Sequence, residues 1–306
     1  CGSAASSNST PTPSTLALNH VHSIVIAPHN ANALYMGTHY HLYKSVNGGK
    51  TWQSLTHLMM LSMAMDPAHQ STLYAVSNSR GFLKTTDAGK RWEAPGPGLP
   101  TGSITGVAVN PVTGTVLAYG VGMYRSTDRA AHWTRVLKGQ SLRSVTVSTD
   151  GTGYAGSDAG IYVSHDDGRT WTLAGNGANQ PIINIVAAQH VAYAAGGVAV
   201  LRTSNDGRTW QALFKAPIGV EFLGVSPTNP NEVFGEVGSQ GLYASYDGGK
   251  TWQAANNGIP DRDFNASTIK VASASPNVVY TGSWGLHVYV SHTGGHHWTR
   301  VATLLR

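Results

Sequence analysis

Histidine and methionine side chains gather near the start of the chain. Six of the 14 histidines fall between residues 20 and 57, and four of the six methionines follow directly, at Met59, Met60, Met63 and Met65. Imidazole and thioether ligands together suit copper. Methionines spaced by two along a strand are also typical of a core, and His-x-His pairs are common without metal, so both interpretations stay open. The candidate metal ligands are His20, His22, His39, His41 and His57.

Carboxylates offer a second kind of chemistry. Two carboxyl groups roughly 5 to 10 Å apart can hydrolyse a glycosidic bond, one as acid and the other as base or nucleophile. In this chain Glu221 paired with Asp158 or Glu236 could supply them. A glycoside hydrolase is therefore one alternative function.

The elements that must position these groups form an internal repeat. Seven of the eight tryptophans are spaced 38 to 46 residues apart, and each ends an octet of the pattern Ser/Thr-x-Asp/Asn-x-Gly-x-x-Trp. A clear copy is Ser164-His-Asp166-Asp-Gly168-Arg-Thr-Trp171. Two copies depart from the pattern, because Ala130 replaces the glycine in one and Thr293 replaces the acid in the other.

The octet pattern indicates a self-contained turn. An Asp or Asn side chain can accept hydrogen bonds from turn amides two and three residues further on, the hydroxyl adds another, and glycine adopts the positive φ. The tryptophan supplies a large apolar surface between sheets. We therefore expect a structural role, and no catalysis or calcium binding, for Asn47, Asp87, Asp128, Asp166, Asn205 and Asp247.

Three strand-like segments precede each octet and one follows it. In the third repeat we expect strands at residues 104–109, 115–119, 123–126 and 132–137. The octets resemble the Asp-box, or bacterial neuraminidase repeat, of sialidases, sortilin-type domains and photosystem-assembly propellers. The resemblance covers the chain after residue 18 and implies an all-β fold, a single seven-bladed propeller of four-stranded antiparallel blades.

Family resemblance also places the expected site over the central channel, on the face opposite the octets. Aligning the first strands on their proline turns puts several ionisable residues near that mouth, and the loops between second and third strands add others. The expected ligand-binding residues are His22, His39, His41, Arg80, Arg143, Glu221, Lys270 and Trp284. Sialidase motifs are missing, since Gly258-Ile259-Pro260 is the nearest string to Arg-Ile-Pro.

The N-terminal segment predicts an anchor. Cys1 is the one cysteine and is followed by small polar residues, as in a mature bacterial lipoprotein. Residues 1–18 then form a Ser/Thr/Pro-rich tether, and residues 19–306 the propeller. We expect the protein outside the cytoplasmic membrane, attached to its outer face through lipidated Cys1.

Charge and composition limit the partners. The net charge is +5, but lysine and arginine are scattered and no run of four basic residues occurs, so nucleic acid is not an expected partner. We expect a monomer without a cofactor that binds a protein, peptide or glycan at the channel mouth. A glycoside hydrolase and a metal-binding protein remain the alternatives.

Overall fold

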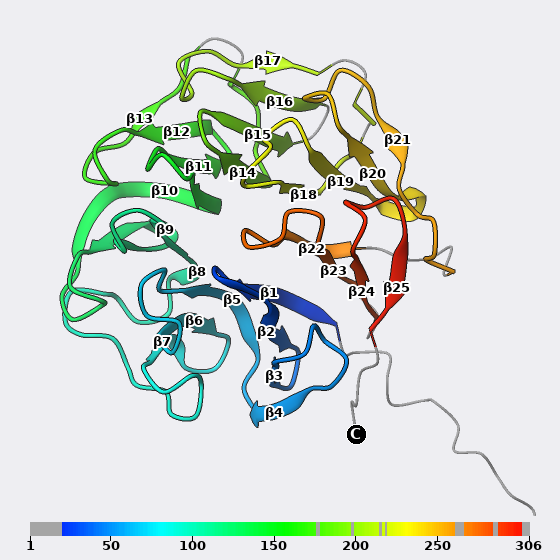
Figure 1. Ribbon diagram of the computed structural model, residues 1–306. Helices are drawn as coiled ribbons and strands as arrows, with labels where there is room; N and C mark the ends of the chain where they lie inside the picture. The colour runs from blue at the N-terminus through cyan, green and yellow to red at the C-terminus, as the bar shows by residue number, and fades with distance from the viewer. Residues whose placement is uncertain are drawn as a thin grey trace, which may run out of the picture.

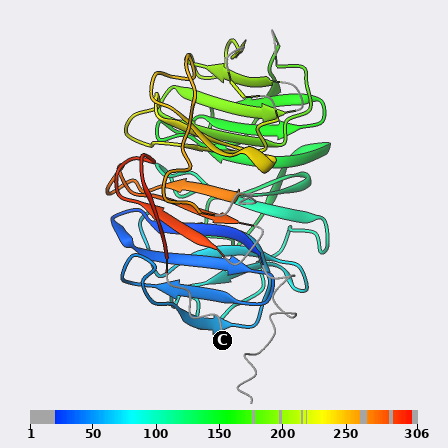
Figure 2. The same ribbon diagram turned by 90° about the vertical axis from the view of Figure 1, so that its right-hand side faces the viewer.

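The computed structural model describes residues 20–175, 178–196, 199–213, 216–217, 219–260, 266–283 and 287–301. They form a ring of antiparallel β-sheets around a central channel (Figure 1). Seen from the edge, the strands run across the thickness of the ring (Figure 2). In this part of the chain no helix has the length and apolar character needed to cross a membrane.

Four sheets have four strands each, in simple sequence order from the channel outward. The first contains β1 (Val21–Ala27), β2 (Asn30–Thr38), β3 (Leu42–Ser45) and β4 (Gln53–Thr56). Another contains β14 (Asn184–Ala188), β15 (Val191–Gly196), β16 (Ala199–Thr203) and β17 (Gln211–Ala212). The next contains β18 (Phe222–Val225), β19 (Val233–Val237), a 3-10 turn η1 (Gly238–Gln240), β20 (Gly241–Ser245) and β21 (Gln253–Ala254). The last contains β22 (Ala266–Val271), β23 (Val279–Ser283), β24 (Val288–Ser291) and β25 (Trp298–Arg300).

The other two sheets depart from this plan. One has three strands, β5 (Met60–Met65), β6 (Leu73–Ser77) and β7 (Gly81–Thr85). The other has six, β8 (Ile104–Val109), β9 (Val116–Ser126), β10 (Thr134–Val147), β11 (Gly153–Ser157), β12 (Gly160–Ser164) and β13 (Thr172–Leu173).

The prediction of seven four-stranded blades is therefore wrong, because the described strands form six sheets. The main cause is β10, whose 14 residues pair with β9 at one end and with β11 at the other. Residues 134–147 contain no proline, so every amide can join a ladder, and two sequence repeats share one sheet. In the three-stranded sheet the expected fourth strand is reduced to a single bridge between Lys84 and Glu93.

Seven octet turns share one hydrogen-bonding arrangement. The hydroxyl of the first residue accepts the amide of the fifth, as from Gly168 to Ser164 Oγ at 2.9 Å. The side chain of the third residue accepts the amide of the seventh, as from Thr170 to Asp166 Oδ1 at 2.9 Å. The carboxylate thus reaches an amide four residues on, further than the sequence pattern suggests. Ala130, which replaces the glycine in one octet, still adopts a positive φ of 67°.

Apolar packing between neighbouring sheets forms the core and closes the ring. Val21, Ile24 and Trp52 of the first sheet share one buried cluster with Tyr280 and Val288 of the last. The Tyr280 hydroxyl also donates to the carbonyl of Ala31 at 3.1 Å across the same junction. Closure therefore depends on face-to-face burial between the two ends of the chain.

The octet hydrogen bonds can be tested with Ser164→Ala. The substitution leaves the buried amide of Gly168 without its acceptor, which costs about 1 to 3 kcal/mol. Urea unfolding should show that loss, whereas Ser141→Ala, at an exposed position of β10, should change stability by less than about 0.5 kcal/mol. Equal effects of the two substitutions would contradict the structural role of the hydroxyl.

Candidate functional site

A repeated β-bulge shapes one mouth of the central channel. In β1 the register passes from Val21↔Thr38 to Ser23↔Gly37, which leaves His22 as the extra residue on the inner strand. Bulges re-aim side chains in this way. The equivalent extra residues on other inner strands are Leu61, Thr105, Arg143 and Ser267, from three further sheets, and all five line a channel cavity of about 290 Å³.

The pairing register of β22 with β23 changes the position of one expected site residue, Lys270. Sequence alignment on the proline turns places Lys270 beside His22 and Arg143, but the bulge position in β22 belongs to Ser267. Lys270 pairs with Tyr280 three residues further along and faces the interior of the channel. Desolvation there lowers the pKa of its ammonium group. Lys270 therefore belongs to the channel wall and not to the mouth.

The five candidate histidines form two groups. His20, His22 and His39 lie together, with ring centroids 4.1 Å apart for His20 and His22 and 5.8 Å apart for His22 and His39. His41 lies instead against His57, 4.3 Å away between centroids, and its Nδ1 is 3.2 Å from the Ser54 hydroxyl. Three of the four neighbouring methionines are not part of either group, because Met60, Met63 and Met65 belong to a buried apolar cluster.

Burial and repulsion by neighbouring rings lower the pKa of His20 and His22 in the first histidine group. The pKa of His22 is lowered to about 4, first by desolvation and then by the neighbouring rings of His20 and His39. The pKa of His20 is lowered by the same two causes. In the second group, desolvation and His57 lower the pKa of His41. Near neutral pH the imidazoles of His20, His22 and His41 therefore carry an unprotonated nitrogen that can accept a proton or bind a metal.

Of the candidate catalytic carboxylates, Glu221 and Glu236 lie together and Asp158 lies apart from them. Glu221 and Glu236 are neighbours, since the Glu221 amide donates to the Glu236 carbonyl at 3.0 Å. Glu236 is fully buried, and among the described residues neither of its carboxylate oxygens has a hydrogen-bond partner. Burial and then the charge of Glu221 raise its pKa to about 8. Asp158 belongs to a different sheet and forms an ion pair with Arg143 at 2.7 Å.

The remaining expected ligand-binding residues are dispersed or not described. Arg80 is exposed in the turn between β6 and β7. Trp284, and the lipidation candidate Cys1, lie outside the described residues.

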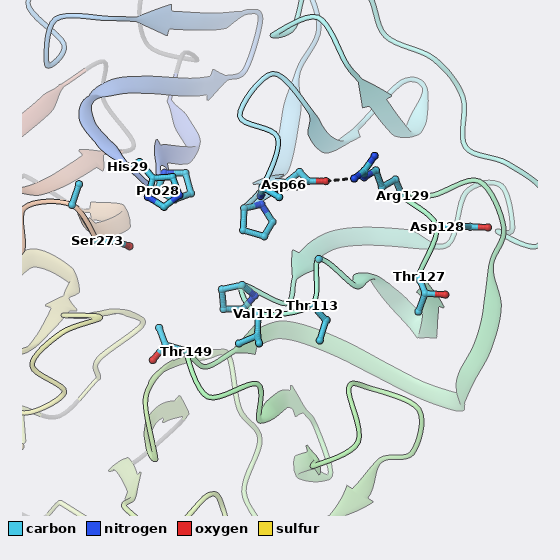
Figure 3. A pocket seen from close by; sticks show the side chains of 15 residues that line it. Pro28, His29, Asp66, Val112, Thr113, Thr127, Asp128, Arg129, Thr149 and Ser273 are labelled. Atoms are coloured by element: carbon cyan, nitrogen blue, oxygen red, sulfur yellow. Dashed lines mark hydrogen bonds and ion pairs between the residues drawn. The ribbon is translucent and has the colours of Figure 1, made fainter.

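A larger cavity, of about 960 Å³, opens at the other mouth of the channel, on the octet face. Its wall is built from the turns that follow the first strands, which meet at the centre of the ring. Figure 3 shows Pro28, Asp66, Val112, Thr149 and Ser273 around this common opening. We call this space the octet-face cavity. It combines a proline-rich, partly apolar wall with polar groups from several strand ends, as small-ligand and peptide sites do.

An ion pair marks one side of the octet-face cavity (Figure 3). The buried carboxylate of Asp66 accepts the amides of Ala68 and His69, both at 2.9 Å, and lies 3.5 Å from Nε of Arg129. The Arg129 side chain is 54% exposed, so its guanidinium can also meet a ligand. Its backbone has a φ of 57°, as expected for the fourth residue of an octet, since Ala88 and Asp167 at the same position have φ values of 62° and 61°.

Sequence reasoning missed this cavity, although two signals pointed to it. Pro28, Pro67 and Pro111 end successive first strands, which places all three turns around one channel mouth. The octet that contributes Thr127, Asp128 and Arg129 is the copy in which alanine replaces glycine. A departure from a structural repeat is a reason to look for function at that position.

The family comparison matches most of the repeat region. Residues 14–261 fit the family described as photosynthesis system II assembly factor YCF48. The chain belongs to the YCF48 family. A solved structure of YCF48 bound to D1 peptide has 20% sequence identity and a TM-score of 0.71, with 90% of this chain and 92% of that one covered. At this identity the likeness shows the fold alone.

Larger glycoside hydrolases also resemble this YCF48-family chain. The GH74 xyloglucanase from Xanthomonas campestris has 18% identity and a TM-score of 0.74, covering 93% of this chain and 55% of that one. A probable oligoxyloglucan-reducing end-specific xyloglucanase from Neosartorya fischeri is 32% identical over 152 residues, which is 42% of this chain and 18% of that protein. The chain thus spans about half of the first hydrolase and less than a fifth of the second.

The buried carboxyl group of this YCF48-family chain predicts a pH dependence of stability. Below pH 4.5, its ordinary pKa, Glu236 is protonated in both the folded and the unfolded state. Between pH 4.5 and about 8 Glu236 ionises only in the unfolded state. Its contribution to the free energy of unfolding should therefore fall by about 1 kcal/mol per pH unit.

Urea unfolding of the wild type and Glu236→Gln from pH 4 to 9 measures this contribution as the difference between the two curves. The difference should grow in favour of the Gln variant as pH rises. Exposed Glu93→Gln is the control and should track the wild type. A pH-independent difference for Glu236→Gln would contradict the raised pKa.

Proposed function

We propose that this chain is a peptide-binding assembly module whose ligand occupies the octet-face cavity. The observation that carries the proposal is the convergence of the first-strand turns on one cavity of about 960 Å³ beside a half-exposed arginine. Membership of the YCF48 family supports it, and so does the solved YCF48 that holds D1 peptide.

The lining of the cavity suits an extended peptide. Pro28, Pro111 and the 62% exposed Val112 offer apolar surface for side chains. Thr149 supplies a hydroxyl group within the same wall, which accepts the Gln189 amide at 3.0 Å and can still donate to a peptide carbonyl. The Thr113 hydroxyl is instead held by the Asp167 carboxylate at 2.7 Å. The guanidinium of Arg129 contacts Asp66 and the ring of His69 and can also meet a peptide carboxylate, because its side chain is 54% exposed.

The cavity can be blocked without disturbing the fold. Val112→Arg places a long charged side chain at the exposed rim of the cavity, whereas Val46→Arg adds the same charge to an octet turn that does not line it. In an immobilised peptide array that includes the D1 peptide, Val112→Arg should weaken binding at least about tenfold and Val46→Arg by less than about twofold.

Two outcomes would contradict the proposal. One is the absence of binding to any arrayed peptide at concentrations up to about 1 mM. The other is equal loss in the two variants, which would show that charge and not the cavity controls binding.

Glycan binding or hydrolysis is the competing function, favoured by the xyloglucanase relatives. Against hydrolysis, Glu236 is fully buried and the carboxylate of Asp158 is engaged by Arg143. Incubation with xyloglucan oligosaccharides and aryl glycosides, sialosides included, distinguishes the classes. Turnover that Glu221→Gln abolishes would replace the peptide-binding proposal with a hydrolase.

We further propose that lipidated Cys1 holds the module at the outer face of a bacterial membrane. The support is the sequence alone, a single cysteine followed by a Ser/Thr/Pro-rich segment. Metabolic labelling of bacteria with a palmitate analogue should mark the wild-type protein and fractionate it with membranes. Cys1→Ser should lose both the label and the membrane fraction, and an unlabelled wild type would contradict the anchor.

A further inference from the structure

We propose that His20, His22 and His39 form a binding site for one divalent transition-metal ion, Zn²⁺ or Cu²⁺, at the channel mouth opposite the octet-face cavity. One ligand nitrogen from each ring lies within 4.8 Å of the other two. The third pair of rings, His20 and His39, has its centroids 5.3 Å apart, so all three histidines are mutual neighbours.

The local backbone explains why these rings meet. The bulge in β1 directs His22 toward the channel, and His20 precedes the same strand. His39 directly follows Thr38, the residue that pairs with Val21 between the other two histidines. A strand start, a bulge and the adjacent strand end therefore present three imidazoles to one point. The other bulge positions of the ring hold Leu61, Thr105, Arg143 and Ser267, none of them a metal ligand of this kind.

Two of the nitrogens are buried without a hydrogen-bond partner among the described residues, namely Nε2 of His22 and Nδ1 of His39. A buried polar atom left unpaired costs about 1 to 3 kcal/mol, so such an atom calls for an explanation. A metal ion would satisfy both at once. By contrast, Nδ1 of His190 in a second His/Asp group already lies 2.8 Å from Asp150 and 2.9 Å from Asp206. The His190 nitrogen in that group is therefore already paired within the protein.

The three imidazole nitrogens determine which metal ions the site favours. Three imidazoles without a thiolate or carboxylate favour Zn²⁺ and Cu²⁺ over the oxygen-seeking Mg²⁺ and Ca²⁺. Zinc–imidazole bonds of about 2.0 to 2.1 Å require bound nitrogens to lie no more than about 4.2 Å apart, so small side-chain rotations would close the site. Three protein ligands leave a fourth position for water or a ligand group.

Metal binding can be measured on the chain of residues 1–306 without a histidine tag. All variants carry Cys1→Ser, so that the one thiol supplies no ligand. After dialysis against ZnCl₂, elemental analysis should find one equivalent of zinc, and calorimetry a Kd of about 1 μM or tighter. His22→Gln and His39→Gln should each weaken binding at least about tenfold. The double variant His41→Gln/His57→Gln, from the neighbouring pair of rings, is the matched control and should bind as the wild type does.

A measurement on the wild-type side chains guards against variants that fail to fold. Addition of Zn²⁺ should shift the imidazole nitrogen NMR signals of His20, His22 and His39 and leave that of His190 in place. Cu²⁺ should give an electron paramagnetic resonance spectrum with nitrogen hyperfine splitting. Absence of zinc binding at about 100 μM, loss of binding in the His41/His57 control, or shifts confined to other histidines would each overturn the proposal.

Discussion

Burial of apolar side chains between neighbouring sheets is the interaction on which the whole molecule depends. Each sheet alone would expose two faces, and the ring covers them by stacking every sheet on the next. The junction between the first and last sheets is critical because no covalent link secures it. There Val21, Ile24 and Trp52 pack against Tyr280 and Val288. The ring brings the inner strands to a common axis, and only because of this convergence do residues distant in sequence share the channel and its two mouths.

Sequence alone could predict the all-β propeller, because the octets recur at nearly constant spacing and their Gly and Trp residues have simple structural roles. It could not predict how many sheets result. The segment through Leu137 and Ser141 continues one strand from repeat to repeat, and nothing in its hydrophobic pattern separates a long strand from two short ones. Residues 115–119 and 123–126 likewise merge into β9, although the pattern suggests two strands.

The candidate sites, like the fold, could be predicted from the sequence only in part. The pairing of Arg143 with Asp158 and the proximity of His22 to His39 follow from strand order, which the repeat reveals. The position of Lys270 in the channel wall does not follow from strand order. One bulge shifts the register between the proline turn and the channel mouth, and this bulge is not evident from the sequence. The octet-face cavity was also hidden, since its wall consists of turns that each look like an ordinary strand connection. The two mouths consequently differ in chemistry, with imidazoles at one and a proline-lined space beside Asp66 and Arg129 at the other.

The continuity of β10 has a consequence for how the ring could have grown. Where a loop joins two sheets, a repeat can be gained or lost by recombination with little more than a change in loop length. Where one strand belongs to both repeats, excision cuts through a hydrogen-bonded ladder and leaves unpaired amides on each side. The two repeats joined by β10 should therefore be inherited as a single evolutionary unit, and permuted termini should be tolerated at the other junctions before they are tolerated there.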